Sequence, residues 1–372
     1  MKRFYKEERG FALALVLLIT TLVVITVLEF NYEMRVDASI ASNYRDDLKA
    51  LYIAKGGVNA AIALLRQDFR TDKERHAGQQ VDSLDEDWAK PEMTLQIGKG
   101  VATGMIIDES GKINLNEYLK ESEDEEDKSG DGKNKGGGEK SIETKEEQKE
   151  NIVRRIFDNL SVSNNNTDEI IESLLDWLGE SSEDNPSIEA YYHSSPSPYD
   201  SKISLLDDIT ELILVKGMSK NVFYQEKEKN LYEEITGQEK DETEISKPFP
   251  SIFTVYSKLK GEININTAPK EVLLAFHEDM DEETVSEIID KRTEEPFESK
   301  DEVKKLSQTI QDIFEDKPEG LKGIRDLIDV KSNFFRIIAH GTINNVTKTI
   351  EAVVFRDAKN DGRITIKSWA EF

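Results

Sequence analysis

Hydrophobic residues near the start of the chain form one unbroken run, and a helical pattern continues it. Residues Phe11–Leu28 carry no charged side chain. A helix rises about 1.5 Å per residue, so roughly 18 residues are close to the minimum that spans a bilayer. Beyond Glu29, apolar residues recur at helical spacing, at Tyr44, Leu48, Leu51, Tyr52, Val58, Ile62, Leu65 and Phe69. No proline interrupts this span, so the pattern predicts one long helix from Phe11 to Phe69.

The flanks of the apolar run predict its orientation and one weak point in the helix. Lys2, Arg3, Lys6 and Arg9 precede the run. By the positive-inside tendency, this short leader stays in the cytoplasm and the rest of the chain after the run is exported. The pair Gly56-Gly57 is the expected weak point, because glycine costs about 1 kcal/mol against alanine inside a helix.

The middle of the chain contains an internal repeat. The segment Gly111–Asn116 (GKINLN) returns as Gly261–Asn266 (GEININ). Each copy follows a strand-like segment, Val101–Asp108 or Ile252–Ser257, and precedes a helical region. The helices expected after the two copies are Ile152–Leu160, Asp168–Leu178, Leu205–Val215, Pro269–His277, Glu282–Arg292 and Lys300–Leu306.

The last part of the chain has β-type composition, with turn residues between the strands. Strands are expected at Asn333–Ile343, Val346–Arg356 and Arg363–Ala370. Asn344-Asn345 and Asp357–Gly362 separate them as turns. The pattern therefore predicts an antiparallel meander that lies beneath the long amino-terminal helix.

Two stretches lack the apolar residues that a core requires. Residues 120–150 contain one Ile and no aromatic side chain, and residues 225–247 are a weaker case. Such segments do not bury enough apolar surface to offset their ordering entropy, so a disordered acidic loop is expected at 120–150.

Composition excludes several function classes. The formal charge of −26 repels nucleic acid phosphates. The absence of cysteine excludes disulfides, thiol nucleophiles and Cys-type zinc sites. The four histidines stand in unrelated contexts, and no phosphate-binding loop or nucleophile-elbow motif is found. The sequence therefore indicates a protein that is not an enzyme.

The junction before the apolar run resembles that of the type IV pilin and pseudopilin family. Arg9-Gly10 is followed by Phe11-Ala12-Leu13. The resemblance implies that a prepilin peptidase cuts after Gly10, that Phe11 is then N-methylated, and that the apolar segment stays attached as the filament core. The alternative is an ordinary secretory signal peptide, for which the Ala-Ser pairs near Ala38 and Ala41 are the available cleavage sites.

One departure from the family narrows the resemblance. Most members carry Glu at the fifth residue after the cleavage site, where this chain has Leu15. In lacking this Glu, and in the order of several segments, the chain resembles the protein K family of minor pseudopilins of the type II (general) secretion pathway. The segments are Arg45–Leu65, Asp108–Asn116, Ser173–Trp177, Tyr191-Tyr192, Leu205–Met218, Asn264–Leu273 and Phe334–Arg336.

The resemblance implies an α+β fold and a set of partners. A long transmembrane helix would continue into a pilin-like antiparallel sheet that carries a large inserted helical domain of helix-hairpin-helix or SAM-like type. The expected division is 1–10 leader, 11–30 transmembrane segment, 31–110 helix and first strands, 111–260 inserted helical domain, 261–325 second helical region and 326–372 meander. The implied partners are minor pseudopilins I and J, the major pseudopilin, the prepilin peptidase and the inner membrane, with the body in the periplasm.

Two segments of the sequence are candidate binding sites. Segment 264–306 resembles a helix-hairpin-helix module, but His277–Met280 replaces the Gly-hydrophobic-Gly turn that grips phosphate, which argues against nucleic acid. Asp176, Glu180, Glu183, Asp184 and Glu189 form the best metal candidate. Oxygen ligands without histidine favour Ca²⁺, which the resemblance also implies nearby. A solvated acidic loop is equally consistent with the spacing.

The leading hypothesis is a structural minor pseudopilin at the tip of the type II secretion pseudopilus, where it starts assembly and supports secretion. The alternatives are a tip minor pilin of a type IV pilus and an exported acidic binding or adaptor protein. The mature amino terminus separates the pilin hypotheses from the adaptor.

Overall fold

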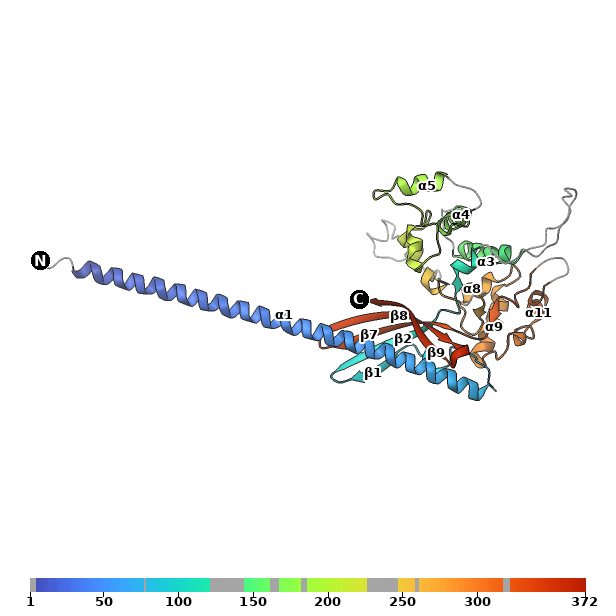
Figure 1. Cartoon of the computed structure of the whole chain (residues 1–372), viewed down its shortest axis with the longest axis horizontal. Coiled ribbons are helices and arrows are strands. Elements are labelled where there is room, and N and C mark those ends of the chain that lie inside the picture. The colour runs from blue at the N-terminus through green and yellow to red at the C-terminus, as the bar shows by residue number, and fades with distance from the viewer. Residues whose placement is uncertain are drawn as a thin grey trace, which may run out of the picture.

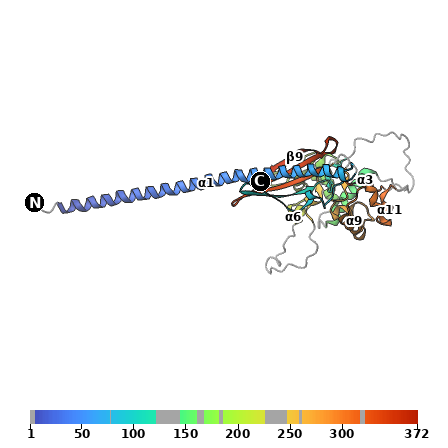
Figure 2. The same ribbon diagram turned by 90° about the horizontal axis from the view of Figure 1, so that it is seen from below.

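The computed structural model describes residues 5–76, 78–120, 144–160, 167–181, 186–225, 247–257, 261–316 and 322–372. One long helix, α1, projects from a body that gathers around its carboxyl-terminal end (Figures 1 and 2). The body has a sheet against α1 and a helical part on the far side of the sheet (Figure 1).

Helix α1 spans Tyr5–Arg75 without a break, and its second half lies on a five-stranded sheet. The strands are β1 Met93–Ile97, β2 Gly100–Asp108, β7 Phe334–Ile343, β8 Val346–Asp357 and β9 Arg363–Glu371. Their order is β1-β2-β7-β8-β9, and every neighbouring pair is antiparallel. The predicted long helix and the predicted carboxyl-terminal meander are therefore confirmed.

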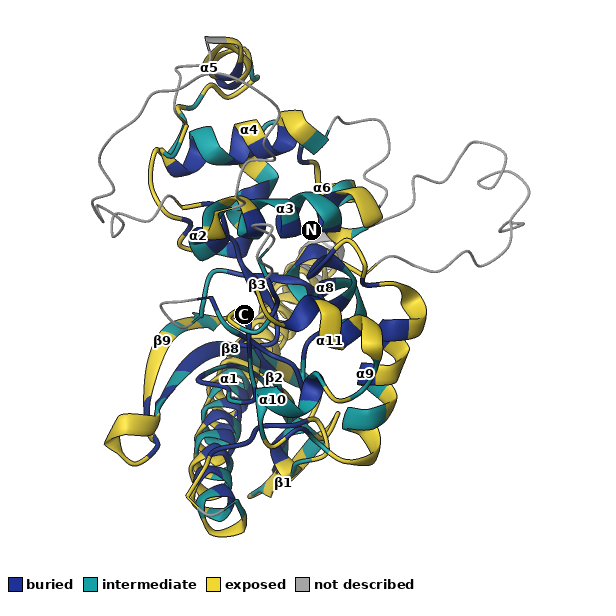
Figure 3. Cartoon of the chain, turned by 90° about the vertical axis from the view of Figure 1, so that its right-hand side faces the viewer, coloured by how far each residue is buried: buried dark blue, intermediate teal, exposed yellow. Residues whose placement is uncertain are grey.

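The sheet holds α1 through side chains that alternate along its central strands. Phe335, Ile337 and Ala339 of β7 are buried while their neighbours are less so. They pack with Val58 and Leu65 of α1 in one apolar cluster. The central strands are buried and the edge strands β1 and β9 are largely exposed, as Figure 3 shows. Apolar residues recur at every second position in the strand and at helical spacing in α1, so each element has one apolar face. Packing of these two faces is what the sequence pattern predicts.

The glycine pair in α1 lies where the helix approaches the sheet closely. A Cβ on Gly57 would lie 3.3 Å from the Cβ atoms of Ala102 and Ala339. On the opposite side of the interface, a Cβ on Gly341 would lie 2.1 Å from the main-chain oxygen of Ala50. The weak point expected at Gly56-Gly57 stays a prediction, although α1 is continuous through both residues. Close approach of the helix to the strands accounts for these glycines.

The helical part contains short helices from both halves of the middle region. From the first half come α2 Leu115–Tyr118, α3 Lys145–Asn159, α4 Thr167–Leu178, α5 Pro186–His193, η2 Ile209–Leu214 and α6 Lys220–Tyr224. From the second come α8 Lys270–Ala275, α9 Glu282–Glu294, α10 Lys300–Val303 and α11 Gln308–Phe314. Three-residue 3-10 turns lie at η1 Asp87–Ala89, η3 Phe249–Ser251 and η4 Ala358–Asn360. Buried apolar residues of both halves form one continuous core.

The internal repeat has one structural role in both copies. β3 Ile113–Asn114 pairs in parallel with β4 Phe253–Thr254, and β5 Ile263–Asn264 pairs in parallel with β6 Ile328–Asp329. In each copy the Oδ1 atom of the first Asn accepts a hydrogen bond from the main-chain N–H of the second, at 2.9 and 3.0 Å. The motif thus closes a turn from a short strand into the following helical segment.

The second Asn of each copy anchors a distant segment. The amide of Asn116 exchanges two hydrogen bonds with the main chain of Leu206, both 2.9 Å long. The amide of Asn266 does the same with Phe297, at 3.0 and 2.9 Å. The repeated Asn-x-Asn therefore provides the backbone with the partners that a buried main-chain group requires.

Three local expectations need correction. Residues 145–150 are helical, because Thr144 and Glu147 form a capping box and Gln148 is buried against the carbonyls of Lys322 and Gly323. Of the acidic segment, residues 121–143 lie outside the described residues, as do residues 226–246 of the second stretch. The helix expected at Leu205–Val215 is a 3-10 segment, and the one expected to reach Leu306 ends at Val303.

Candidate functional site

The first half of α1 is an apolar rod that touches nothing else in the described chain. The large apolar residues from Phe11 to Phe30 are exposed, and the apolar window of this helix is long enough to cross a membrane. Figures 1 and 2 show this half standing clear of the body in both views. An exposed apolar surface of this size is stable in lipid or against other apolar helices, not in water.

Polar side chains within the apolar rod are satisfied locally. The Thr20 hydroxyl donates to the Val16 carbonyl at 2.9 Å, and Thr21 donates to Leu17 at 2.8 Å. Thr26 donates to Leu22 at 2.9 Å. Bonds to the preceding turn leave no hydroxyl hydrogen without a partner in hydrocarbon, where an unmade hydrogen bond costs several kcal/mol. The rod is therefore chemically suited to a membrane.

The residues predicted for processing lie at the free end of the rod. Gly10 and Phe11 are consecutive residues of α1, and the side chain of Phe11 is 72% exposed. A Cβ at Gly10 would meet no atom within 4 Å. Nothing in the described body shields this peptide bond. Cleavage after Gly10 and methylation of Phe11 remain predictions.

An apolar groove runs beside α1 where the helix reaches the sheet. It has a volume of about 250 Å³ and is bordered by Gly57, Ala60 and Leu64 of α1 and by Leu95 and Met105 of the first two strands. Leu95 and Met105 are exposed. Small residues on the helix and apolar ones on an edge strand make a surface that another helix can pack against.

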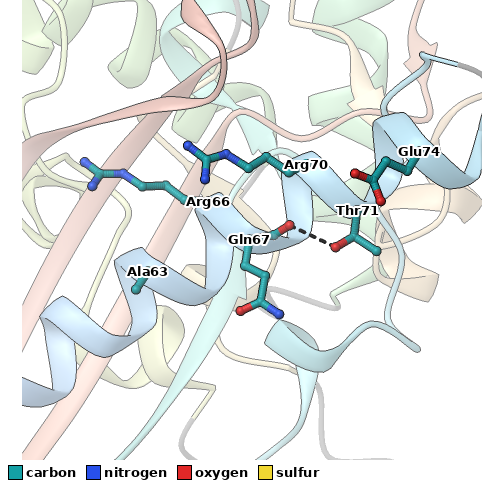
Figure 4. A pocket seen from close by; sticks show the side chains of 6 residues that line it. All are labelled: Ala63, Arg66, Gln67, Arg70, Thr71 and Glu74. Atoms are coloured by element: carbon teal, nitrogen blue, oxygen red, sulfur yellow. Dashed lines mark hydrogen bonds between the residues drawn. The ribbon is translucent and has the colours of Figure 1, made fainter.

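The outward face of α1 carries a basic hollow of different character. Ala63, Arg66, Gln67, Arg70, Thr71 and Glu74 line it. Figure 4 shows the Arg66 and Arg70 side chains on one side of the helix and Gln67 and Thr71 on another. Because the lining comes from a single helix, the hollow lacks the convergent polar groups that distinguish a binding or active site.

A buried ionic network joins the sheet to the helical part. Glu109 is fully buried and pairs with Lys112 Nζ at 2.6 Å and Arg336 Nε at 2.9 Å. The Thr254 hydroxyl of β4 donates to the same carboxylate. Burial acts to raise the pKa of Glu109, but the two cations outweigh it and lower the pKa to about 2. This carboxylate therefore stays charged at neutral pH and links three segments.

A second ionic network lies beside the first. Arg356 of β8 is fully buried and pairs with Asp82 and, at 3.1 Å, with Asp68 of α1. Its guanidinium carbon lies 4.7 Å from the ring centre of Phe335. Asp82 Oδ2 accepts from the Ser332 N–H at 2.7 Å. Arg356 thus connects α1, the segment after it and the start of β7.

Local sequence patterns do not predict these networks. Their ion-paired partners are up to 288 residues apart in the chain. The sequence does contain one indication of them. Arg356 stands at an alternate position of its strand, in step with the buried Ala352 and Val354. A charged residue at a core-facing strand position indicates a buried partner.

The predicted metal residues are not all within the described chain. Asp176 lies half-buried in the last turn of α4, Glu180 follows that helix, and Glu189 is exposed on α5. Glu183 and Asp184 lie outside the described residues. The three described acids do not form a group with carboxylate oxygens within 4.8 Å of one another. The Ca²⁺ site at 176–189 stays a prediction.

Comparisons with known proteins agree on one family. Two family models, both described as type II secretion system protein K, match residues 111–226 and 263–321. The type II secretion system protein K of Pseudomonas aeruginosa is 23% identical to the chain over 369 residues, covering 97% of this chain and 92% of that protein.

A solved structure agrees on the fold. A chain in the crystal structure of the GspK–GspI–GspJ complex from the type 2 secretion system of enterotoxigenic Escherichia coli superposes with a TM-score of 0.59. The two are 14% identical, and the match covers 89% of this chain and 99% of that one. The α+β architecture, with a long amino-terminal helix on an antiparallel sheet and an added helical part, is shared, as the sequence predicts.

Proposed function

The chain belongs to the protein K family of the type II secretion system, and we propose that this minor pseudopilin occupies the tip of the pseudopilus and starts its assembly. The observation that carries the proposal is the unbroken α1. Its first half is an exposed apolar rod and its second half is fixed on the sheet. A rod of this kind anchors a subunit in the membrane and then packs among the rods of other subunits.

The tip position is supported by the residue at position 15. In related filaments, a carboxylate at this position is thought to contact the amine of the subunit ahead. Leu15 has no charge, and it sits within the exposed apolar rod. A carboxylate in hydrocarbon is retained only with a partner. A subunit with no neighbour ahead has no amine to pair with such a carboxylate.

The partners we propose are minor pseudopilins I and J, which assemble with the relative in the solved complex, and the major pseudopilin below them. The groove between α1 and the first strands, next to Ala60 and Met105, is the surface that fits a partner's apolar helix. The prepilin peptidase would act at Gly10-Phe11, with the rod in the inner membrane and the body in the periplasm.

The family is a structural component of the secretion system, and we propose that this chain has no catalytic role. The basic hollow and the apolar groove both lack a nucleophile with an adjacent base. The buried carboxylates of Glu109 and Asp82 form ion pairs that hold segments of the chain together.

Cysteine crosslinking tests the partner surface directly, because the chain has no cysteine of its own. Ala60→Cys places a thiol at the groove, and Lys359→Cys places one in the exposed turn between β8 and β9 as the matched control. Coexpression with single-cysteine variants of pseudopilins I and J should yield a crosslinked species for Ala60→Cys alone. Equal crosslinking from both positions would contradict the groove as the contact.

Terminal sequencing separates the remaining alternatives. A mature chain that starts at N-methyl-Phe11 supports a pilin-type subunit, whereas a terminus beyond residue 28 supports an exported adaptor. Deletion of the gene distinguishes the two filament systems. Loss of protein secretion with pili intact supports the secretion system, and loss of pili with secretion intact supports a type IV pilus.

A further inference from the structure

Four carboxylates converge where α1 ends, away from the metal site that the sequence predicts. Asp68 and Asp72 lie one turn apart in the last part of α1, and Asp82 and Glu86 lie in the segment that follows the helix. One oxygen from each of the four lies within 4.8 Å of the others. Among the described residues, no other three acids bring their carboxylate oxygens this close together.

The acidic cluster, defined as Asp68, Asp72, Asp82 and Glu86, is largely buried and contains more carboxyl groups than cationic partners. Asp72 is 1% exposed and Asp82 is fully buried. Arg356 is paired with two of the four and supplies one positive charge. If all four carboxyl groups were ionised in a site with little water, their repulsion would exceed what one guanidinium offsets.

The pKa values of the cluster reflect this excess. Burial, followed by the neighbouring carboxylates, raises the pKa of Asp68 to about 7, of Asp72 to about 6 and of Glu86 to about 10. A further positive charge at the centre of the cluster would relieve the same repulsion.

A second observation points to a ligand. Asp72 Oδ2 is buried and has no hydrogen-bond donor. Gln80, which is 5% exposed, donates from Nε2 to Asp82 Oδ2 at 2.6 Å, and its own Oε1 also lacks a donor. Buried oxygen acceptors are seldom left without a partner in folded proteins. Two such oxygens at one acidic cluster indicate that a cation belongs there.

We propose that the acidic cluster binds a hard divalent cation, Ca²⁺ in preference to Mg²⁺, and that this site fixes the end of α1 to the segment 80–86. The ligands are carboxylate oxygens of the four acids. The four oxygens lie within 4.8 Å of one another, and two oxygens bound to one Ca²⁺ at about 2.4 Å can be no farther apart than about that distance. Mg²⁺ requires shorter bonds of about 2.0 Å and retains several waters, which suits this crowded acidic set poorly.

The position of the site gives it a structural role. Asp82 also contacts Arg356 of β8 and the main chain of Ser332, which precedes β7. A cation bound by α1 and by Asp82 would therefore hold the helix, the sheet and the start of β7 together. In a chain without cysteine, it would take the place of a disulfide at this junction.

The first experiment counts bound metal. The full chain is purified in detergent, stripped with EDTA and equilibrated with Ca²⁺, and its calcium is measured by mass spectrometry. Asp72→Asn and Glu86→Gln remove charge without changing shape and leave the pairs of Arg356 intact. Each should weaken Ca²⁺ binding about tenfold or more. Asp87→Asn is the matched control, since Asp87 is exposed and pairs with Lys90 outside the cluster.

The second experiment locates the ion with Tb³⁺, a luminescent substitute for Ca²⁺ that nearby tryptophan sensitises. The Trp88 indole donates to the Glu86 carboxylate, so it lies beside the cluster. Trp177 instead follows Asp176, next to the site predicted at 176–189. Trp88→Phe should abolish the Tb³⁺ signal that Asp72→Asn also abolishes, and Trp177→Phe should leave that signal unchanged.

The outcomes separate the two sites. The proposal is supported if Asp72→Asn and Glu86→Gln each lose one bound Ca²⁺ and keep the native circular dichroism spectrum. The melting temperature of each variant should then be the same with and without EDTA. Unchanged Ca²⁺ binding in both variants would overturn it, as would a Tb³⁺ signal that depends on Trp177 and is insensitive to Trp88→Phe. A triple variant of Asp176, Glu180 and Glu189 to their amides should retain the calcium of the acidic cluster.

Discussion

The contact between α1 and β7 depends on a glycine that no other residue can replace without moving the helix. A Cβ at Gly341 would lie 2.1 Å from Ala50 O, 2.3 Å from Ala54 N and 3.0 Å from Ala54 Cα. All three are main-chain atoms of α1, so no side-chain rotation relieves the clash. Ordinary contact requires about 3.5 Å, so the helix must shift by roughly 1 Å or more. Overpacking of this kind costs about 1–3 kcal/mol, and we expect Gly341→Ala to lie at or above the upper end.

Gly56→Ala provides the matched test, because the same chemical change is made on the other side of the same interface. Its Cβ would meet Ile97 Cδ1 at 2.7 Å, which is the flexible end of a side chain. The helix gains about 1 kcal/mol from replacing glycine by alanine, which offsets the cost of moving Ile97. We therefore expect Gly56→Ala to be neutral or stabilising.

Thermal and urea unfolding of the full chain in detergent, followed by circular dichroism, measures both variants. A loss of about 3 kcal/mol lowers the melting temperature by roughly 6–12 °C in a body of this size. The reasoning would be refuted if Gly341→Ala unfolded at the wild-type temperature, or if Gly56→Ala were the more damaging of the two.

Three further predictions concern other parts of the molecule. Glu109→Gln should cost about 3–5 kcal/mol at pH 7, because Lys112 and Arg336 stay buried without their carboxylate. Since the pKa of Glu109 is lowered from 4.5 to about 2, its contribution is present above about pH 4.5 and is lost as the pH falls toward 2, so the difference in urea midpoint between wild type and variant should narrow over that range. Gly10→Asp should leave an uncut precursor in the membrane, visible by gel shift and terminal sequencing, and normal processing would count against a prepilin junction. Leu15→Glu should reduce secretion or change pseudopilus length, because an unpartnered carboxylate in hydrocarbon costs several kcal/mol, whereas wild-type behaviour would remove the positional meaning of Leu15.

Periodicity alone predicted the parts of the fold that repeat a simple pattern. The apolar spacing from Phe11 to Phe69 lies within α1, and the three carboxyl-terminal strands match their expected ranges to within a residue or two. The Asn-x-Asn repeat was visible as a repeat, but its purpose was not. Only the structure shows that Asn116 and Asn266 reach Leu206 and Phe297.

Local sequence rules missed the features that depend on distant partners. The capping box at Thr144 was written in the sequence, yet the acidic composition around it favoured a loop. The acidic cluster joins residues of α1 to residues of the next segment, and each acid alone resembles many others in a chain of charge −26. A usable signal was the placement of Asp68 and Asp72 beside the buried Phe69, since acids next to a core position need a partner.

A set of buried polar and charged residues lies between the two apolar cores of the fold. The cluster that packs α1 on the sheet and the core of the helical part are separate sets of residues. Between them lie Asp108, Asn264, Ser332 and Arg356, all buried and connected by hydrogen bonds, and the adjacent Glu109, which is buried and bonds to Arg336. Apolar packing has little directional preference, whereas hydrogen bonds and ion pairs fix distance and angle. A polar seam between two apolar cores therefore sets the orientation of the helical part relative to α1. If α1 is anchored and the helical part contacts partners, as proposed above, any force between the two must pass through this seam.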